Sequence, residues 1–343
     1  MNRYRLTVLD SCPPAAVPAS CEDFLAQLGG PTLIRLSGRD RSRCRVVNTL
    51  LHGNEPSGAR AVHRFLREGQ VPATDLLVFV ISVAAALAEP LFSHRQLPGE
   101  RDMNRCFRAP FDGDQGRLAA DILAAMDRSR PEAVVDIHNT SGDGPSFAVC
   151  TEDRPVYYRL AGHFSHRLVV TDLRLGALME NTRDDRPIIT VECGGAREGA
   201  ADLLAWQGLR RYTETEDLFA DAPVEFDLYR HPVRLELQDG ATIAYAEEPH
   251  PTADITLSER IDRRNFGVVA RDTAIAWIRD PGCIRVRNAD GGIPLEDFFE
   301  VRNGSLYPVR ELKLFMVTTN PIIARDDCLL YAVREDCHDR AAE

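Results

Sequence analysis

Three short apolar runs of this chain end in residues that could do chemistry. In the first, "LLHGNEPSGARAV", His52 and Glu55 lie three residues apart where the apolar run gives way to a helical pattern. In a turn or a first helical turn, this spacing lets both side chains face one point in space. The pair alone predicts either two ligands of a metal ion or a surface histidine beside a helix-capping carboxylate.

The second run, "VVDIHNT", ends in His138, with Asp136 two residues earlier on the same strand face. Two histidines and a glutamate are the ligand set of catalytic zinc sites that leave one position open for water. Asp136 could hold the second ring nitrogen of a ligating histidine. The hypothesis is one zinc ion (Zn²⁺) per chain, although iron, cobalt or nickel could occupy the same residues. The alternative is that His138 is a hydrogen-bonded core histidine.

The third run, "PIITVECGG", carries Glu192 at its end. Hydrolysis by a metal-activated water needs a proton acceptor that can pass the proton to a leaving amine. A lone carboxylate at the end of an apolar run suits that role. The alternative is a structural glutamate held in a salt bridge.

A fourth motif, "GERDMNRCF", places an amide and a guanidinium side by side at Asn104 and Arg105. Arginine binds a carboxylate through two parallel hydrogen bonds, so the pair suits an acidic substrate. A polar pair in a surface turn is the alternative. The formal net charge is −11, so a pocket for an acid must contain arginines that reverse the average field. Lys313 is the one lysine of the sequence, which argues against P-loop and Schiff-base mechanisms.

The four motifs H-G-N-E-P, D-M-N-R, D-I-H-N and T-V-E-C-G stand in this order along the chain. Together they resemble the succinylglutamate desuccinylase and aspartoacylase family, relatives of the zinc carboxypeptidases, over residues of about 45 to 220. The resemblance implies a zinc-dependent amidohydrolase that cleaves an N-acyl amino acid of the N-succinylglutamate or N-acetylaspartate type. It also implies the residue roles: metal ligands His52, Glu55 and His138; general base and acid Glu192; carboxylate clamp Asn104 and Arg105.

The substrate side of the predicted pocket departs from the family pattern. Family members often carry an arginine several residues before the D-x-N-R stretch, and here Arg95 and Arg101 are the candidates. We take Arg101 as a further substrate-binding residue. Arg183 either contacts a second substrate carboxylate or lies on the surface. These differences leave the acyl group and the amino acid open.

The elements that must position these residues form two regions. From about residue 30 to 220, buried strand patterns alternate with amphipathic helical patterns, which predicts an α/β domain over residues 1–222. Short alternating segments follow and predict a smaller β-rich C-terminal domain over residues 223–343. The resemblance adds that the first domain is zinc carboxypeptidase-like, with a mixed sheet flanked by helices.

Three other functions fit parts of this pattern. A zinc carboxypeptidase acting on peptide C-termini would share the ligands and the clamp, and a non-catalytic protein could use the metal site to bind a small acid. A thiol hydrolase could use Cys150 or Cys193 as its nucleophile. The sequence contains no G-x-S-x-G elbow of a serine hydrolase and no G-x-G-x-x-G stretch for a dinucleotide.

Composition indicates the partners and the cellular compartment to expect. The acidic net charge argues against nucleic-acid binding, and no apolar stretch is long enough for a membrane helix. Nine cysteines without paired spacing, together with an N-terminus unlike a secretory signal, predict reduced thiols in the cytoplasm. The expected partner is a small-molecule N-acyl amino acid, and the chain could form a homo-oligomer.

Overall fold

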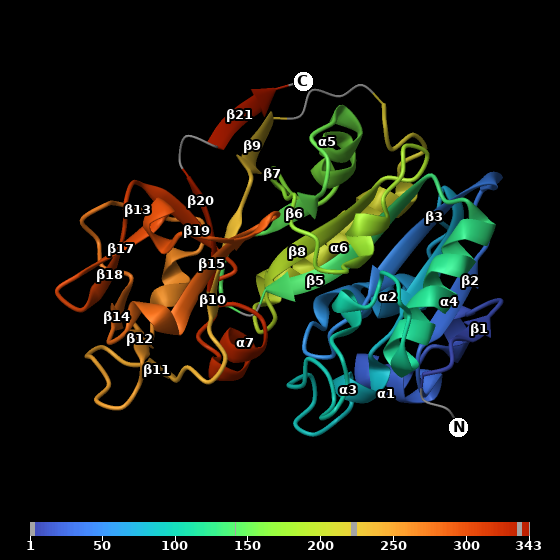
Figure 1. The fold of residues 1–343 in the computed structure, drawn as a ribbon. Helices are drawn as coiled ribbons and strands as arrows, with labels where there is room; N and C mark the ends of the chain where they lie inside the picture. Colours follow the sequence, from blue (N-terminus) through green and yellow to red (C-terminus); the bar gives the residue numbers. More distant parts are fainter. Residues whose placement is uncertain (1–3, 141, 221–224, 335–337, 343) are drawn as a thin grey trace.

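A ten-stranded mixed sheet organises the computed structural model, which describes residues 4–140, 142–220, 225–334 and 338–342 (Figure 1). In spatial order its strands are β1 (Thr7–Leu9), β2 (Thr32–Leu36), β4 (Thr74–Val80), β3 (Asp40–Thr49), β5 (Ala133–Thr140), β8 (Ile188–Gly195), β6 (Phe147–Cys150), β7 (Arg167–Val170), β9 (Glu225–Arg230) and β21 (His338–Ala342).

The middle of this sheet is parallel, because β4, β3, β5 and β8 all run in one direction. Neighbouring residues on these strands enter different cores: Val46 and Val134 pack on one face, whereas Val47 and Val135 pack on the other. Burial on both faces explains why these strands are continuous apolar runs.

Helices cover both faces of the sheet. The core on one face includes residues of α1 (Cys21–Leu28), α2 (Ser57–Glu68), α5 (Pro155–Gly162) and α6 (Gly199–Glu214), and α4 (Gly113–Ser129) packs on the other. Local residues fix the helix ends: the Ser20 side chain accepts a hydrogen bond from the Asp23 N–H at the start of α1, and Gly29 ends it with a φ of 68°. Short helices complete this region: η1 (Pro14–Ala16), α3 (Val83–Ala86), η2 (Met103–Arg105) and η3 (Leu178–Asn181).

The C-terminal part contains two further sheets around a core of its own, drawn in orange and red in Figure 1. The six-stranded sheet consists of β13 (Val268–Val269), β19 (Leu312–Phe315), β20 (Leu330–Arg334), β10 (Val233–Leu237), β15 (Ile284–Asn288) and β16 (Gly291–Ile293). The five-stranded sheet consists of β11 (Ile243–Tyr245), β12 (Ile255–Leu257), β14 (Ala276–Ile278), β18 (Ser305–Pro308) and β17 (Phe299–Arg302). The helices of this C-terminal part are short: η4 (Ile261–Arg264), η5 (Pro281–Cys283), η6 (Leu295–Asp297) and α7 (Pro321–Asp326).

The predicted fold class is confirmed: a mixed α/β sheet flanked by helices is followed by a β-rich region. The two regions do not divide cleanly at residue 222, because β9 pairs with β7 and β21 pairs with β9. A cut at that residue would separate β9 from the strand on which it forms. The short sequence pattern of β9 resembles the strands that follow it, so the sequence alone gave no reason to assign it to the large sheet.

Two expectations from composition can be compared with this structure. Within the described residues, no helix is both long and apolar enough to cross a bilayer. The eight cysteines in the described ranges form no disulfide bond with one another.

Candidate active site

His52 and Glu55 follow the carboxyl end of β3 in a sharply turning segment. Leu50 adopts a left-handed backbone conformation with a φ of 59°, which breaks the strand direction two residues before His52. Gly53 packs against α3 so closely that an added Cβ would lie 2.6 Å from the backbone nitrogen of Ala86. The glycine of the H-G-N-E motif is therefore required by packing.

The three predicted ligands converge beneath this turn. The Nδ1 atom of His52 lies 2.8 Å from Oε1 of Glu55, and Nδ1 of His138 lies 2.6 Å from Oε2 of the same carboxylate. All three side chains are buried, and their ligand atoms lie within 4.8 Å of one another. Two imidazole nitrogens and a carboxylate oxygen at this separation fit a zinc ion with an open position.

Each imidazole has a second carboxylate on its other ring nitrogen. His138 Nε2 lies 2.8 Å from Asp136 Oδ2, and His52 Nε2 lies 2.9 Å from Asp102 Oδ1. Asp136 is fixed in turn by the side-chain amide of Asn48, which donates to Oδ1 at 2.6 Å. Such carboxylates set the orientation and basicity of a ligating histidine.

These carboxylates also control protonation. Burial lowers the pKa of His138, but the charges of Asp136 and Glu55 outweigh burial and raise this pKa well above its ordinary value. Burial and the charge of Arg95 lower the pKa of His52. The charges of Glu55 and Asp102 raise it by more, so the net shift of this pKa is upward. In its protonated form each ring donates to carboxylates from both nitrogens. A bound metal ion would replace the protons on the two nitrogens that face Glu55.

Glu192 lies beside His138 because β5 and β8 pair in register. His138 is the direct cross-strand partner of Glu192, so both side chains project from the same face of neighbouring parallel strands. The glutamate is 6% exposed, and its Oε2 atom is buried without a hydrogen-bond partner among the described residues. Burial raises the pKa of Glu192 to about 7, with a smaller raising effect from Glu55 and opposing effects from the cations nearby.

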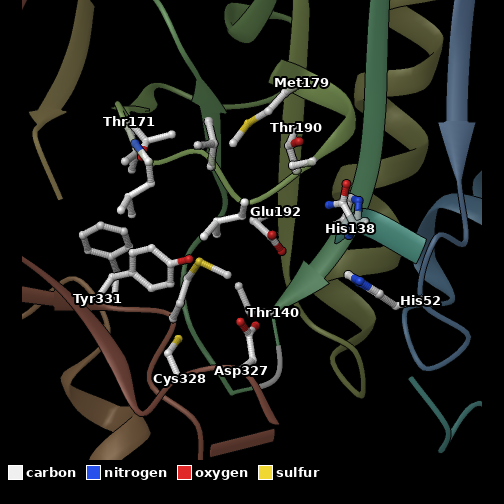
Figure 2. A pocket seen from close by; sticks show the side chains of 18 of the residues that line it. His52, His138, Thr140, Thr171, Met179, Thr190, Glu192, Asp327, Cys328 and Tyr331 are labelled. Carbon is white, nitrogen blue, oxygen red and sulfur yellow. The ribbon is translucent and has the colours of Figure 1, made fainter. Parts of the chain in front are cut away.

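One cavity joins this cluster to the β-rich region. It is lined at one end by His52, Glu55, His138 and Glu192, and Figure 2 shows Glu192 between the two histidines and the side chains of the C-terminal part. The clamp residues Asn104 and Arg105 also line it. Asn104 is anchored, since its Oδ1 accepts the Leu178 N–H at 2.9 Å.

The structure separates the two arginines considered as extra substrate contacts. Arg95 lines the cavity, with Nη1 3.6 Å from Glu55 Oε1. Arg101 does not line this cavity: its guanidinium donates to the backbone carbonyl of Asp112 at 3.1 Å. The substrate-binding role predicted for Arg101 therefore has no support in its position, and Arg95 is the better placed of the two. Arg183 is an exposed residue whose guanidinium lies 3.2 Å from Asp127.

Asp327 brings a carboxylate into the cavity from the segment between α7 and β20. Its Oδ1 accepts from Nη2 of Arg105 at 2.8 Å and from Nη2 of Arg234 at 2.5 Å. Its Oδ2 lies 3.6 Å from Nη2 of Arg95. Burial raises the pKa of Asp327, but the three arginines outweigh that effect and leave the pKa well below its ordinary value.

Asp102 and Asp327 are not among the residues that the sequence motifs predict. Asp102 opens the D-M-N-R motif and could have been recognised as a carboxylate near a histidine ligand. Asp327 contacts Arg105 across 222 positions of sequence, and no local motif marks it.

The predicted alternative nucleophiles Cys150 and Cys193 do not fit a thiol mechanism. Both are buried, and burial raises the pKa of the Cys150 thiol to about 12 and that of Cys193 well above its ordinary value. A nucleophilic cysteine needs the opposite shift, because the thiolate is the reactive form.

The fold is shared with solved structures over most of the chain. Murine aminoacylase 3 superposes with a TM-score of 0.56 at 13% identity, covering 89% of this chain and 98% of that one. Succinylglutamate desuccinylase from Vibrio cholerae gives 0.58 at 12% identity, covering 94% and 99%. The succinylglutamate desuccinylase from Chromobacterium violaceum gives 0.55 at 14% identity, covering 90% and 88%. At these identities the likeness concerns the fold alone.

Sequence comparison finds a family model that matches the region containing the candidate metal ligands. No curated protein matches the chain by sequence. The family model of the succinylglutamate desuccinylase/aspartoacylase catalytic domain matches residues 47–207, which include all three candidate ligands, the clamp and Glu192. The predicted resemblance is confirmed over residues 47–207, where the sequence matches the catalytic-domain model of the succinylglutamate desuccinylase/aspartoacylase family.

Proposed function

We propose that this protein is a zinc-dependent amidohydrolase that releases the acyl group from an N-acyl amino acid. The observation that carries the proposal is the position of Glu192 beside the cluster of His52, Glu55 and His138: it is a buried carboxylate, and none of the described residues bonds its Oε2 atom. Glu192 is suited to proton transfer, because burial raises its pKa to about 7, which is close to neutral pH.

His52, Glu55 and His138 would hold the zinc ion. When bound, zinc supplies a water of lowered pKa and polarises the amide carbonyl. Glu192 accepts the proton of the attacking water on its carboxylate and then donates this proton to the departing amine nitrogen. Burial of Glu192 excludes bulk water from this exchange.

The arginines of the cavity would orient the substrate. Arg105 and Asn104 suit the carboxylate of the amino acid, since a guanidinium and an amide both donate hydrogen bonds. Arg95, whose Nη1 lies 3.6 Å from Oε1 of Glu55, would donate to the carbonyl oxygen as negative charge develops on it. Asp136 and Asp102 act through the histidines, whose rings they orient.

Two other functions use the same residues. A carboxypeptidase would hydrolyse dipeptides and longer peptides, and a binding protein would hold an acid without turning it over. The position of Glu192 favours catalysis, because a binding site gains nothing from a buried carboxylate with an unpartnered oxygen. We further propose that the protein acts in the cytoplasm, which its cysteines without paired spacing support, and that it forms a homo-oligomer.

The test is hydrolysis by purified, zinc-loaded protein of N-acyl amino acids, dipeptides and longer peptides, before and after chelation. Chelator-sensitive release of an amino acid from an N-acyl substrate, with little cleavage of longer peptides, would support the proposal. Preference for longer peptides would favour the carboxypeptidase. Metal binding without any turnover would favour the binding protein.

A further inference from the structure

The candidate cavity has the charged cluster at one end and a mainly apolar lining beyond it. Apolar side chains from both regions of the chain line the rest of the cavity, among them Val169, Leu173, Met179, Phe315, Ile323 and Tyr331, and the polar side chains of Thr171, Glu180 and Thr190 also line it. Figure 2 shows Met179 and Tyr331 on the side of the cavity away from His52 and His138. A substrate held at the cluster would extend one of its groups against this wall.

Few cations in the cavity are available to bind a carboxylate of the substrate beyond the cluster. Arg95 and Arg105 are the only arginines or lysines that line the cavity in the described ranges. Arg95 also donates from Nε and Nη2 to Asp102 at 3.0 and 2.8 Å. Asp327 contacts both arginines, so a substrate carboxylate competes with a carboxylate already present.

One substrate carboxylate can still be accommodated. Arg105 has 26% of its side chain exposed, and Asn104 stands next to it in η2. A second carboxylate would face either Arg95, which is shared by Asp102 and Asp327, or the apolar wall. Burial of a charge without a partner is strongly unfavourable, so the cavity disfavours diacids.

We propose that the preferred substrate carries a single carboxylate and an apolar aliphatic or aromatic group, and that Asp327 sets this preference by occupying the arginines. The inference rests on the proposed amide hydrolysis. It departs from the acidic N-succinylglutamate and N-acetylaspartate types that the sequence motifs imply. The apolar group is either the amino-acid side chain or the acyl chain.

A substrate panel tests the preference. N-acetylphenylalanine and N-octanoylglycine each carry one carboxylate and an apolar group, on opposite sides of the amide; N-acetylaspartate and N-succinylglutamate carry more than one carboxylate. We expect kcat/KM for at least one apolar substrate to exceed that of both acidic substrates by at least tenfold. Equal or better hydrolysis of an acidic substrate would overturn the inference while leaving the amidohydrolase proposal intact.

Asp327→Asn tests the residue itself. Loss of the carboxylate frees the arginines, so the ratio of kcat/KM for N-acetylaspartate to that for N-acetylphenylalanine should rise at least tenfold, mainly through KM. Asp184→Asn is the matched control, since its side chain is 93% exposed and pairs with Arg154 outside the cavity. An unchanged ratio in folded Asp327→Asn protein would show that Asp327 does not set the substrate preference.

A second variant and a binding measurement keep the test decisive. Met179→Arg places a cation on the apolar wall, and it should raise the same ratio even if Asp327→Asn protein does not fold. Calorimetry with zinc-loaded Glu192→Gln protein measures the affinities for N-acetylphenylalanine and N-acetylaspartate without turnover. Tighter binding of the apolar compound supports the inference, and tighter binding of the diacid contradicts it. Absence of hydrolysis in the wild type would count against the proposed function instead.

Discussion

His138 and Glu192 are direct cross-strand partners on the parallel strands β5 and β8. One residue is a candidate metal ligand and the other is the candidate proton carrier, so a backbone register of the sheet fixes their relative positions. Because neighbouring side chains of parallel strands at the same register project from the same face, no loop movement is needed to assemble this pair. The candidate pair thus stands on two fully buried central strands of the large sheet.

Replacement of Glu192 by Gln should reduce kcat by about 10²- to 10⁴-fold, because an amide cannot accept and return a proton. The shape of the side chain is kept, so zinc content and thermal stability should remain close to those of the wild type. Steady-state kinetics and metal analysis of the same preparation check both expectations. Activity near the wild-type level would show that another group carries the proton.

Asp136 should matter for metal binding although it is not a ligand. Asp136→Asn removes the negative charge from the outer nitrogen of His138, and we expect zinc affinity to fall by about 10- to 100-fold. Competition with a chelating dye measures this change. Asp143→Asn, a substitution outside the cluster, serves as a control for the loss of one carboxylate. Equal affinities of Asp136→Asn and wild type would show that the ring of His138 is oriented by its strand alone.

Sequence patterns accounted for much of this arrangement. His52, His138 and Glu192 were identifiable because buried parallel strands are apolar, and a charged or imidazole side chain at their ends needs a reason. The partners Asp102 and Asp327 were not identified. Asp327 reaches Arg105 through packing of the β-rich region against the large sheet, and no local periodicity carries that information. Sequence spacing did not distinguish Arg95 from Arg101, and the predicted contact of Arg101 is not supported, because its guanidinium donates to the backbone carbonyl of Asp112.

The pH dependence of hydrolysis should report the ionisation of Glu192. Burial raises its pKa to about 7, and the general base acts in its ionised form. The value of kcat/KM should therefore increase as pH rises towards about 7 and then level off; the charge of a bound metal would move this limb to lower pH. Glu192→Gln protein should lack the limb in its residual activity. An acidic limb that survives this substitution would assign it to a different group.

Arg45 should be a main contributor to the stability of the large sheet. Its side chain is 1% exposed, and it donates to Glu132 at 2.5 Å and to the carbonyls of Tyr212 and Thr215 at the end of α6. Arg45→Ala leaves these buried acceptors unpaired and should lower the free energy of unfolding by about 3–5 kcal/mol.

Arg43→Ala is the matched control for this prediction. Arg43 also pairs with Glu132, but its side chain is 38% exposed, so its loss should cost less than about 1 kcal/mol. Urea denaturation of the two variants gives the comparison. Similar losses for both would mean that burial of Arg45 adds nothing to its ion pair.

The central claim is that His52, Glu55 and His138 hold a metal ion that the hydrolysis of an N-acyl amino acid requires. The most direct measurement is the rate of hydrolysis of N-acetylphenylalanine and N-acetylaspartate by chelated protein as zinc is titrated back, with His138→Ala protein in parallel. The account predicts that activity rises to a plateau at one zinc ion per chain, and that His138→Ala protein neither binds zinc tightly nor recovers activity. Full hydrolysis by the chelated protein, or full recovery in His138→Ala, would contradict it.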